Sequence, residues 1–298
     1  MTNERVSDSE KWNVCCGWKR TIFVRAAWQA ESSAGAPIVY VLSMGIGIYE
    51  LQLLQRFRPR GEVLTLGRQN YGVEYAEDLL ISLGASAVVS IDYSNFEGAT
   101  YTGDLSKPVD LGKQFDTIID FGTTEHVFDI AQALENCVQL CKIGGQIFHA
   151  VPANGECGHG FWQMSPELFF SLYSERNGFI ETEVFIADLM DERHWWEASR
   201  PDAGQRLMAN SLTATYVLVH TIKREDRALS VSQPDYEHNW ETRTPQNDRL
   251  PNPSSERLRN LLKASPLKHW GSVVYRSLLS PTGLTRFNPH LRKVRLDP

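Results

Sequence analysis

The chain has little of what marks membrane, secreted or disulfide-bonded proteins. No apolar run reaches the roughly 20 residues that a membrane-spanning helix needs, and the longest candidate, residues 36–49, contains three glycine or proline positions. The first residues, MTNERVSDSEKW, are polar and acidic, whereas a secretion signal is basic and then apolar. Five cysteines, an odd number, fit neither a disulfide framework nor a CxxC zinc pattern. We expect free thiols and a cytoplasmic location.

Charge is unevenly distributed along the chain. The formal net charge is −6, yet the segment from Arg257 to the end holds nine Lys or Arg and one acid, Asp297. This basic tail could bind an anionic partner, such as a phosphorylated carrier, RNA or a membrane surface, or it could pack on the acidic body of the protein. We find no internal repeat and no low-complexity block.

Between residues 61 and 224, short apolar strands alternate with helical patterns, which favours a parallel sheet. The expected fold class is α/β, a Rossmann-like doubly wound and mostly parallel sheet with an antiparallel edge strand. A helical segment (1–60) precedes it and a basic appendage (225–298) follows. Strands are expected at 62–66, 87–91, 116–119, 146–151, 179–187 and 214–222, and helices near 18–29, 49–57, 74–83, 166–175, 255–264 and 268–279. The last two strands form the expected antiparallel pair at the sheet's far edge, with 188–210 as a polar excursion.

The most informative segment is 115–152, FDTIIDFGTTEHVFDIAQALENCVQLCKIGGQIFHAVP. It predicts a strand, a polar turn, a helix that includes His126 and extends to Leu140, a stop at Gly144-Gly145 after Lys142, and a second strand. In open α/β sheets, ligands bind outside the carboxyl ends of the strands. Chemistry is therefore expected just after the first of these strands.

A nucleotide site on such a sheet needs a turn that exposes backbone after the first strand, an acid after the second, and contacts from later strand ends. Gly67 follows the strand EVLTL, and Asp92 follows SAVVSI. Asp104 stands where the third strand would end, and Phe121-Gly122-Thr123 follows the fourth. All these elements occur in the required order.

The stretches VLTLGRQ, GTTEHVF and HGFxxxSPELF (159–169) resemble class I S-adenosylmethionine-dependent methyltransferases, over about 62–224. The likeness is strongest to bacterial enzymes of glycan and secondary-metabolite clusters. The resemblance implies S-adenosyl-L-methionine as the cofactor. It also implies that Asp92, with Tyr93 beside it, binds the ribose hydroxyls, that Asp104-Leu105 flank the adenine, and that residues 121–123 line the cofactor.

The glycine loop departs from the family's pattern. The family usually has an acid two residues before its first glycine and further glycines after it, but here Thr65 replaces the acid and Arg68-Gln69 follow Gly67. Arg68 could hold the cofactor's carboxylate with two hydrogen bonds, which a glycine cannot do. A second candidate loop, Gly45-x-Gly47 within residues 38–50, ranks below the first because it leaves EVLTL without an acid at its end.

Three histidines are candidates for catalysis: His126, His149 and His159. Methyl transfer is an in-line displacement that needs alignment and a base for a hydroxyl or amine nucleophile, which a histidine can supply. We rank His159 and His126 ahead of His149, for which a structural role is more plausible. We expect no metal, since none of the three histidines lies closer than ten residues to another, whereas zinc sites favour short spacings.

The expected activity is methyl transfer to an oxygen or nitrogen of a sugar, a glycan intermediate or a small metabolite. The alternative is a binding or scaffold protein that keeps the fold without catalysis, as the altered glycine loop suggests. Trp195 and Trp196, in a polar context, could form an exposed aromatic wall for the acceptor. Nucleic acid is not an expected partner, because Asp120-Phe121-Gly122-Thr123 replaces the Pro-Pro-Tyr/Trp type of motif that base-directed relatives carry.

Overall fold

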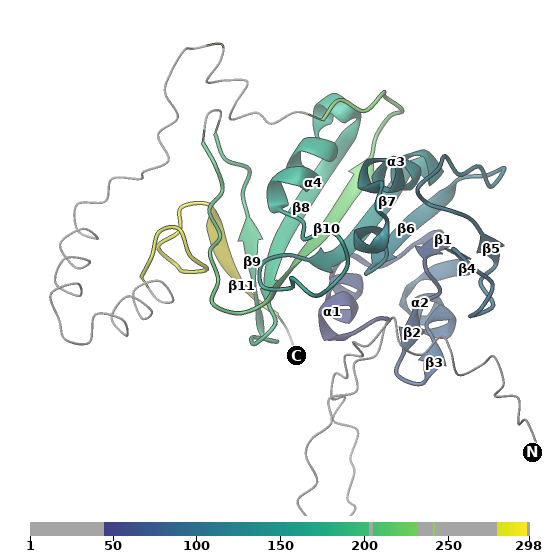
Figure 1. The fold of residues 1–298 in the computed structure, drawn as a ribbon, viewed down its shortest axis with the longest axis horizontal. Coiled ribbons are helices and arrows are strands. Elements are labelled where there is room, and N and C mark those ends of the chain that lie inside the picture. Colours follow the sequence, from purple (N-terminus) through teal and green to yellow (C-terminus); the bar gives the residue numbers. More distant parts are fainter. Residues whose placement is uncertain (1–44, 203–204, 232–240, 242–278, 297–298) are drawn as a thin grey trace, which may run out of the picture.

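Residues 45–202, 205–231, 241 and 279–296 are described by a computed structural model, in which helices cover both faces of a nine-stranded sheet (Figure 1). The strand order is β11-β9-β8-β10-β7-β6-β1-β4-β5, and β2 and β3 form a separate small hairpin. The strands are β1 (Gly61–Leu66), β2 (Asn70–Tyr71), β3 (Glu74–Tyr75), β4 (Ala85–Asp92), β5 (Tyr101–Thr102), β6 (Phe115–Phe121), β7 (Cys141–Pro152), β8 (Phe179–Asp188), β9 (His194–Ala198), β10 (Thr215–Lys223) and β11 (Leu291–Arg295).

The five strands β5, β4, β1, β6 and β7 are parallel. β10 is antiparallel to both β7 and β8 and lies between them. This confirms the expected fold class, including the antiparallel pairing of β8 and β10. From β1 the chain runs outward through β4 and β5, and it then returns to β6 on the other side of β1. The order of the strands reverses there, so the carboxyl ends of β1 and β6 border the crevice where such sheets bind ligands.

The sheet has a hydrophobic core on each face. α1 (Ile48–Phe57) and α2 (Glu77–Leu83) cover one face, and α3 (Ile130–Leu140) and α4 (Pro166–Leu172) cover the other (Figure 1). Neighbouring residues on a strand point to opposite faces, so Ile118 joins the core under α3 and Ile119 the core under α1. Burial on both sides explains why adjacent residues of a central strand, such as Ile118 and Ile119, are both apolar.

The segment after β6 differs from the expected single helix. A short 3-10 helix, η2 (Thr124–His126), comes first, and α3 begins only at Ile130. The cause is local, because the Asp129 carboxylate accepts a hydrogen bond from the Gln132 amide at 3.2 Å and caps α3. A second 3-10 helix, η3 (Glu175–Asn177), follows α4.

The expected helix stop at Gly144-Gly145 lies too late in the chain. α3 ends at Leu140, and β7 begins at Cys141 and includes both glycines. Lys142 therefore does not lie in the last helical turn. It donates instead to both carboxylate oxygens of Asp116 on β6, each at 3.0 Å.

The expected polar excursion at 188–210 contains a strand, β9, and the exposed aromatic wall at Trp195 and Trp196 is wrong. Both tryptophans are buried, Trp195 in the core under α1 and Trp196 in the core under α3. β9 pairs with β8 and also with β11, from the segment expected to be an appendage. The edge of the sheet is therefore β11, and the pair β8 and β10 lies inside it.

Several expectations lie outside the described residues: the helix at 18–29, residues 38–44 of the second candidate loop, the helix at 255–264 and nearly all of the one at 268–279, and most of the basic tail. In the described part of the tail, Lys293 of β11 contacts Asp191 at 3.4 Å, and Arg292 pairs with Glu197. This part of the basic tail thus contacts acids of the body.

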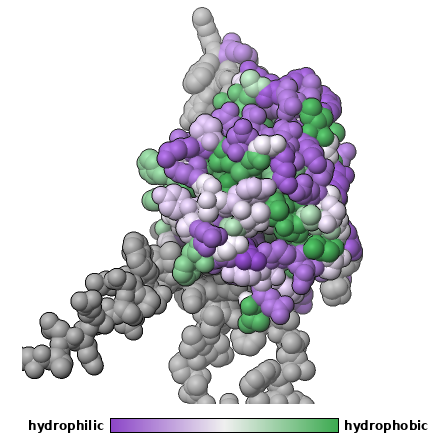
Figure 2. Space-filling model, turned by 90° about the vertical axis from the view of Figure 1, so that its right-hand side faces the viewer, coloured by the Kyte–Doolittle hydropathy of each residue, from purple (hydrophilic) through white to green (hydrophobic). Residues whose placement is uncertain are grey.

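The described residues contain no helix of the length and hydrophobicity that crossing a bilayer requires. On the face at the β4 and β5 end of the sheet, hydrophobic residues form separate patches in a mostly hydrophilic surface (Figure 2). Isolated hydrophobic side chains of this kind are ordinary on protein surfaces.

Lys223 on β10 is a buried cation at the end of α3. Its Nζ donates to the carbonyls of Val138 and Cys141, each at 2.9 Å, where the helix dipole is negative. We expect Lys223→Met to lower the free energy of unfolding by about 2 kcal/mol, because both carbonyls and the Asp226 carboxylate lose this donor. Urea denaturation followed by circular dichroism measures the change. Lys142→Met, which removes a half-exposed ion pair, is the control and should cost less than about 1 kcal/mol; equal costs would contradict the assigned role of Lys223.

Candidate active site

The carboxyl ends of the central strands are joined to one another by hydrogen bonds. The Gly67 amide, just after β1, donates to the Ile91 carbonyl of β4 at 2.8 Å. The Thr123 hydroxyl, after β6, donates to the Leu66 carbonyl of β1 at 2.7 Å. Asp92 is the last residue of β4. The structure therefore brings the predicted cofactor residues of three strands to one edge of the sheet.

Gly67 makes the tight turn that the sequence predicted at the end of β1. Its φ is +69°, a conformation that side chains other than glycine rarely adopt. A Cβ atom there would also lie 2.9 Å from the Thr123 hydroxyl oxygen. Any larger residue at position 67 would therefore strain the backbone and displace the Thr123 hydroxyl, which bonds the Leu66 carbonyl.

Arg68 braces this turn against its surroundings. Its Nε donates to Glu77 at 2.7 Å, its Nη1 donates to the Glu97 and Gly98 carbonyls at 2.7 and 3.2 Å, and its guanidinium lies 3.6 Å from the Tyr75 ring centroid. Two of the three guanidinium nitrogens are thus engaged within the protein. Holding a ligand carboxylate, as the sequence suggested, would involve Nη2 or a rearrangement of these bonds.

The loop after β4 carries three side chains suited to a nucleoside. The half-buried Asp92 carboxylate accepts the Tyr93 amide at 2.6 Å, and the Tyr93 side chain is 77% exposed. Glu97, which the sequence did not single out, is half-buried, and burial followed by the charge of Asp92 raises the pKa of its carboxyl. Asp92 and Glu97 therefore form a carboxyl pair beside Arg68.

Asp104 closes the turn after β5. Its carboxylate accepts the Ser106 hydroxyl at 2.6 Å and amide at 3.0 Å, and it pairs with Lys107 at 2.9 Å. The Ser106 hydrogen bond, with Lys107, lowers the pKa of Asp104 to about 2. The Leu105 side chain is buried in the core, as is that of Phe121, the last residue of β6, so only the backbone of these two residues could face a ligand.

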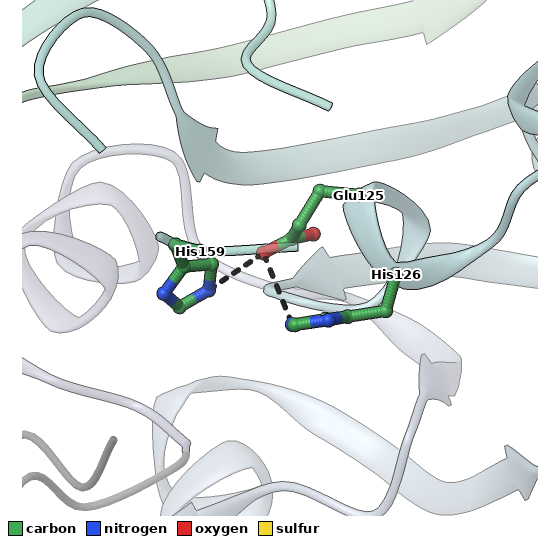
Figure 3. Close-up of side chains that lie close together, drawn as sticks. All are labelled: Glu125, His126 and His159. Atoms are coloured by element: carbon green, nitrogen blue, oxygen red, sulfur yellow. Dashed lines mark hydrogen bonds and ion pairs between the residues drawn. The ribbon is translucent and has the colours of Figure 1, made fainter. Parts of the chain in front are cut away.

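Beside the β6 turn, Glu125, His126 and His159 meet at one carboxylate oxygen (Figure 3). Glu125 Oε1 lies 3.2 Å from His159 Nε2 and 4.0 Å from His126 Nε2. Glu125 is fully buried, and within the described part of the chain its Oε2 has no hydrogen-bond partner. Burial raises the pKa of Glu125, and the His159 hydrogen bond opposes that shift. The structure thus brings together two of the three predicted catalytic histidines, around an acid.

His159 reaches Glu125 because its loop is fastened to the η2 turn. The Phe161 and Trp162 amides both donate to the Glu125 carbonyl, at 2.8 and 3.3 Å. Gly160 lies so close that a Cβ would come within 2.8 Å of that carbonyl oxygen and 2.9 Å of Glu125 Cγ. The sequence HGFW at 159–162 therefore fixes the position of His159.

The third histidine, His149, belongs to a buried network instead. Its Nδ1 lies 2.7 Å from Asp120 Oδ2, and its Nε2 lies 2.6 Å from the Tyr173 hydroxyl. Asp120 also accepts the Thr124 hydroxyl at 2.6 Å and amide at 3.1 Å. Asp120, His149 and Thr124 are fully buried and Tyr173 is nearly so. The network holds the η2 turn, and His149 does not join the cluster of Glu125, His126 and His159.

Three exposed aromatic residues lie next to that cluster. Phe128, Phe161 and Trp162 are 75%, 63% and 37% exposed. The Phe128 ring centroid lies 5.8 Å from that of Phe161 and 6.3 Å from that of Trp162, whose indole N–H donates to the Val127 carbonyl. We call Phe128, Phe161 and Trp162 the aromatic patch.

The search for related proteins found no matching family model and no matching curated protein. Among solved structures, NodS of Bradyrhizobium japonicum, an N-methyltransferase in complex with S-adenosyl-L-homocysteine, is 13% identical with a TM-score of 0.38, over 60% of this chain and 86% of that chain. A SAM-dependent methyltransferase of Thermotoga maritima is 16% identical with a TM-score of 0.37 (58% and 87%). TehB of Haemophilus influenzae is 13% identical with a TM-score of 0.39 (60% and 62%). Similarity this low assigns no activity, so the site is interpreted from its own geometry.

Proposed function

We propose that this protein transfers a methyl group from S-adenosyl-L-methionine to an oxygen or nitrogen of a sugar, a glycan intermediate or a related small metabolite. The observation that carries the proposal is the edge of the sheet at β1, β4 and β6. There a glycine turn, a carboxylate and a histidine–carboxylate cluster lie around the point where the strand order reverses.

The residues on this edge fit the cofactor. Gly67 has no side chain of its own that would obstruct a ligand, and the Asp92 carboxylate can accept both ribose hydroxyls. The exposed Tyr93 ring offers a surface on which adenine can stack. When bound, S-adenosyl-L-methionine supplies a sulfonium methyl group, so the protein itself contributes alignment and a proton acceptor.

His159 is the proton acceptor in this proposal, with His126 beside it. When the Glu125 carboxylate accepts the His159 Nε2–H, the other ring nitrogen, Nδ1, is left to take a proton from a hydroxyl or amine. The aromatic patch next to it offers flat faces for a sugar or a planar ring. His149 acts in this proposal only by positioning, through Asp120 and the η2 turn.

Isothermal titration of the full chain with S-adenosyl-L-methionine and S-adenosyl-L-homocysteine tests the cofactor. We expect both to bind, because the Gly67 backbone and the Asp92 carboxylate that would hold them belong to the protein itself. Binding of neither would refute the methyltransferase proposal.

The bonds of Arg68 support a second candidate, a binding or scaffold protein that retains the fold without transfer. Its guanidinium already bridges Glu77 and the Glu97 carbonyl, next to the turn where the cofactor would lie. A panel of nucleotide sugars and glycans, followed by mass spectrometry for a mass gain of one methyl group, separates the two. Cofactor binding with no methylated product from any acceptor would favour the scaffold.

A further inference from the structure

The cluster of Glu125, His126 and His159 has the composition of a metal centre. Two imidazole nitrogens and one carboxylate oxygen are ligands that zinc and other divalent first-row metals share. Their ligand atoms all lie within 4.8 Å of one another. The two marked contacts converge on Oε1 of Glu125 (Figure 3).

The distance between Glu125 and His159 is close to the one expected for two ligands of a single ion. Ligand atoms about 2.0–2.1 Å from a tetrahedral ion lie about 3.3–3.5 Å apart. The separation of Glu125 Oε1 from His159 Nε2 is 3.2 Å, and that from His126 Nε2 is 4.0 Å. His126 is exposed and can close the longer distance by a small side-chain movement.

One further observation points to a ligand. Glu125 is fully buried, yet its Oε2 has no hydrogen-bond partner among the described residues, so the protein's own donors leave this carboxylate incompletely compensated. The protein has thus placed a buried and incompletely compensated acid beside two histidines.

We propose that Glu125, His126 and His159 bind a divalent first-row transition-metal ion, with Zn²⁺ as the probe. Three protein ligands leave a fourth position open, on the side of the exposed His126. The sequence argument against a metal considered histidines alone; the structure replaces His149 with Glu125, which is adjacent to His126.

The ion would deepen the proposed function, on which its role in catalysis depends. An acceptor hydroxyl at the open position would be acidified by the ion and would lose its proton to water. An oxygen lone pair then forms the bond to the methyl carbon as the carbon–sulfur bond breaks, giving the methyl ether and S-adenosyl-L-homocysteine. His126 and His159 would then be ligands, and the ion would replace His159 as the group that activates the acceptor.

Titration of the chelator-stripped full chain with ZnCl₂, followed by calorimetry and metal analysis after dialysis, tests the site. We expect the unmodified chain to bind one Zn²⁺ at the cluster. The affinity for Zn²⁺ should be at least tenfold weaker in each of Glu125→Gln, His126→Ala and His159→Ala. His194→Ala is the matched control, since His194 contacts the Asp191 carboxylate at 3.0 Å without belonging to the cluster. Its affinity for Zn²⁺ should equal that of the unmodified chain.

Two outcomes would overturn the metal site: no binding of Zn²⁺ by the stripped chain, or binding that all three cluster variants leave unchanged. His126→Ala is decisive if Glu125→Gln fails to fold, because the exposed His126 makes little contribution to the core. Titration with S-adenosyl-L-homocysteine, with and without Zn²⁺, separates this proposal from the previous one. Zinc binding without cofactor binding would refute only the methyltransferase, and the reverse result would refute only the metal site.

Discussion

Asp92→Ala is expected to weaken the binding of S-adenosyl-L-homocysteine about 100-fold, a loss of about 2.7 kcal/mol. The carboxylate at the end of β4 can accept two ribose hydroxyls, and hydrogen bonds to an ionised acceptor are the stronger kind. Isothermal titration of the variant and the unmodified chain gives the two dissociation constants. Asp92→Asn, which keeps one acceptor oxygen, should fall between them.

The matched control is Asp110→Ala, which removes an exposed carboxylate that accepts only the Gly112 amide in a surface turn. Its affinity should be unchanged. If Asp92→Ala bound as tightly as Asp110→Ala, the ribose would have to lie elsewhere. Glu97 would then be the next candidate, because its half-buried carboxyl lies on the same loop after β4.

Asp120→Asn is expected to lower the free energy of unfolding by about 3 kcal/mol. The buried carboxylate accepts from His149, the Thr124 hydroxyl, and the Thr123 and Thr124 amides. An amide offers one acceptor oxygen in place of two, and its NH₂ group would face donors. Urea denaturation followed by circular dichroism measures the loss.

Asp116→Asn, on the same strand, is the control for that measurement. The half-exposed Asp116 carboxylate pairs with Lys142 at 3.0 Å and accepts the Glu62 amide at 2.9 Å. The oxygen of Asn can still accept that amide, so the replacement should cost no more than about 1 kcal/mol. Equal losses in the two variants would show that the buried network contributes no more than a surface ion pair. Tyr173→Phe removes only the Tyr173 hydroxyl, which contacts His149 Nε2, and it should lower the free energy of unfolding by about 1 kcal/mol.

The sequence predicted the fold well because its signals there are periodic and local. The apolar strands, the glycine turn at Gly67 and the acids at Asp92 and Asp104 occur in chain order. The turn and the two acids each lie at or just after the end of a strand. β9 was missed because Trp195 and Trp196 stand in a polar context, and only the cores on both faces of the sheet make two adjacent tryptophans compatible with burial.

The candidate site was harder to predict because it depends on contacts between distant segments. The contact of Glu125 with His159 arises from two backbone hydrogen bonds to the Glu125 carbonyl, which no pattern encodes. The sequence ranks His149 last, but it does not predict the buried network that His149 forms with Asp120 and Tyr173 on either side. A glycine directly after a histidine, as in His159-Gly160, is the signal that could have suggested a close approach.

The pairing of β11 with β9 has a consequence for biosynthesis. β11 is translated long after β8 and β10. Until it is made, the side of β9 that pairs with β11 has unpaired backbone donors and acceptors. A chain cut at Glu225 would keep that side open permanently and would tend to aggregate through it. Loss of activity in such a truncated chain would therefore indicate first that the sheet is incomplete. It would not by itself show that the tail binds an acceptor.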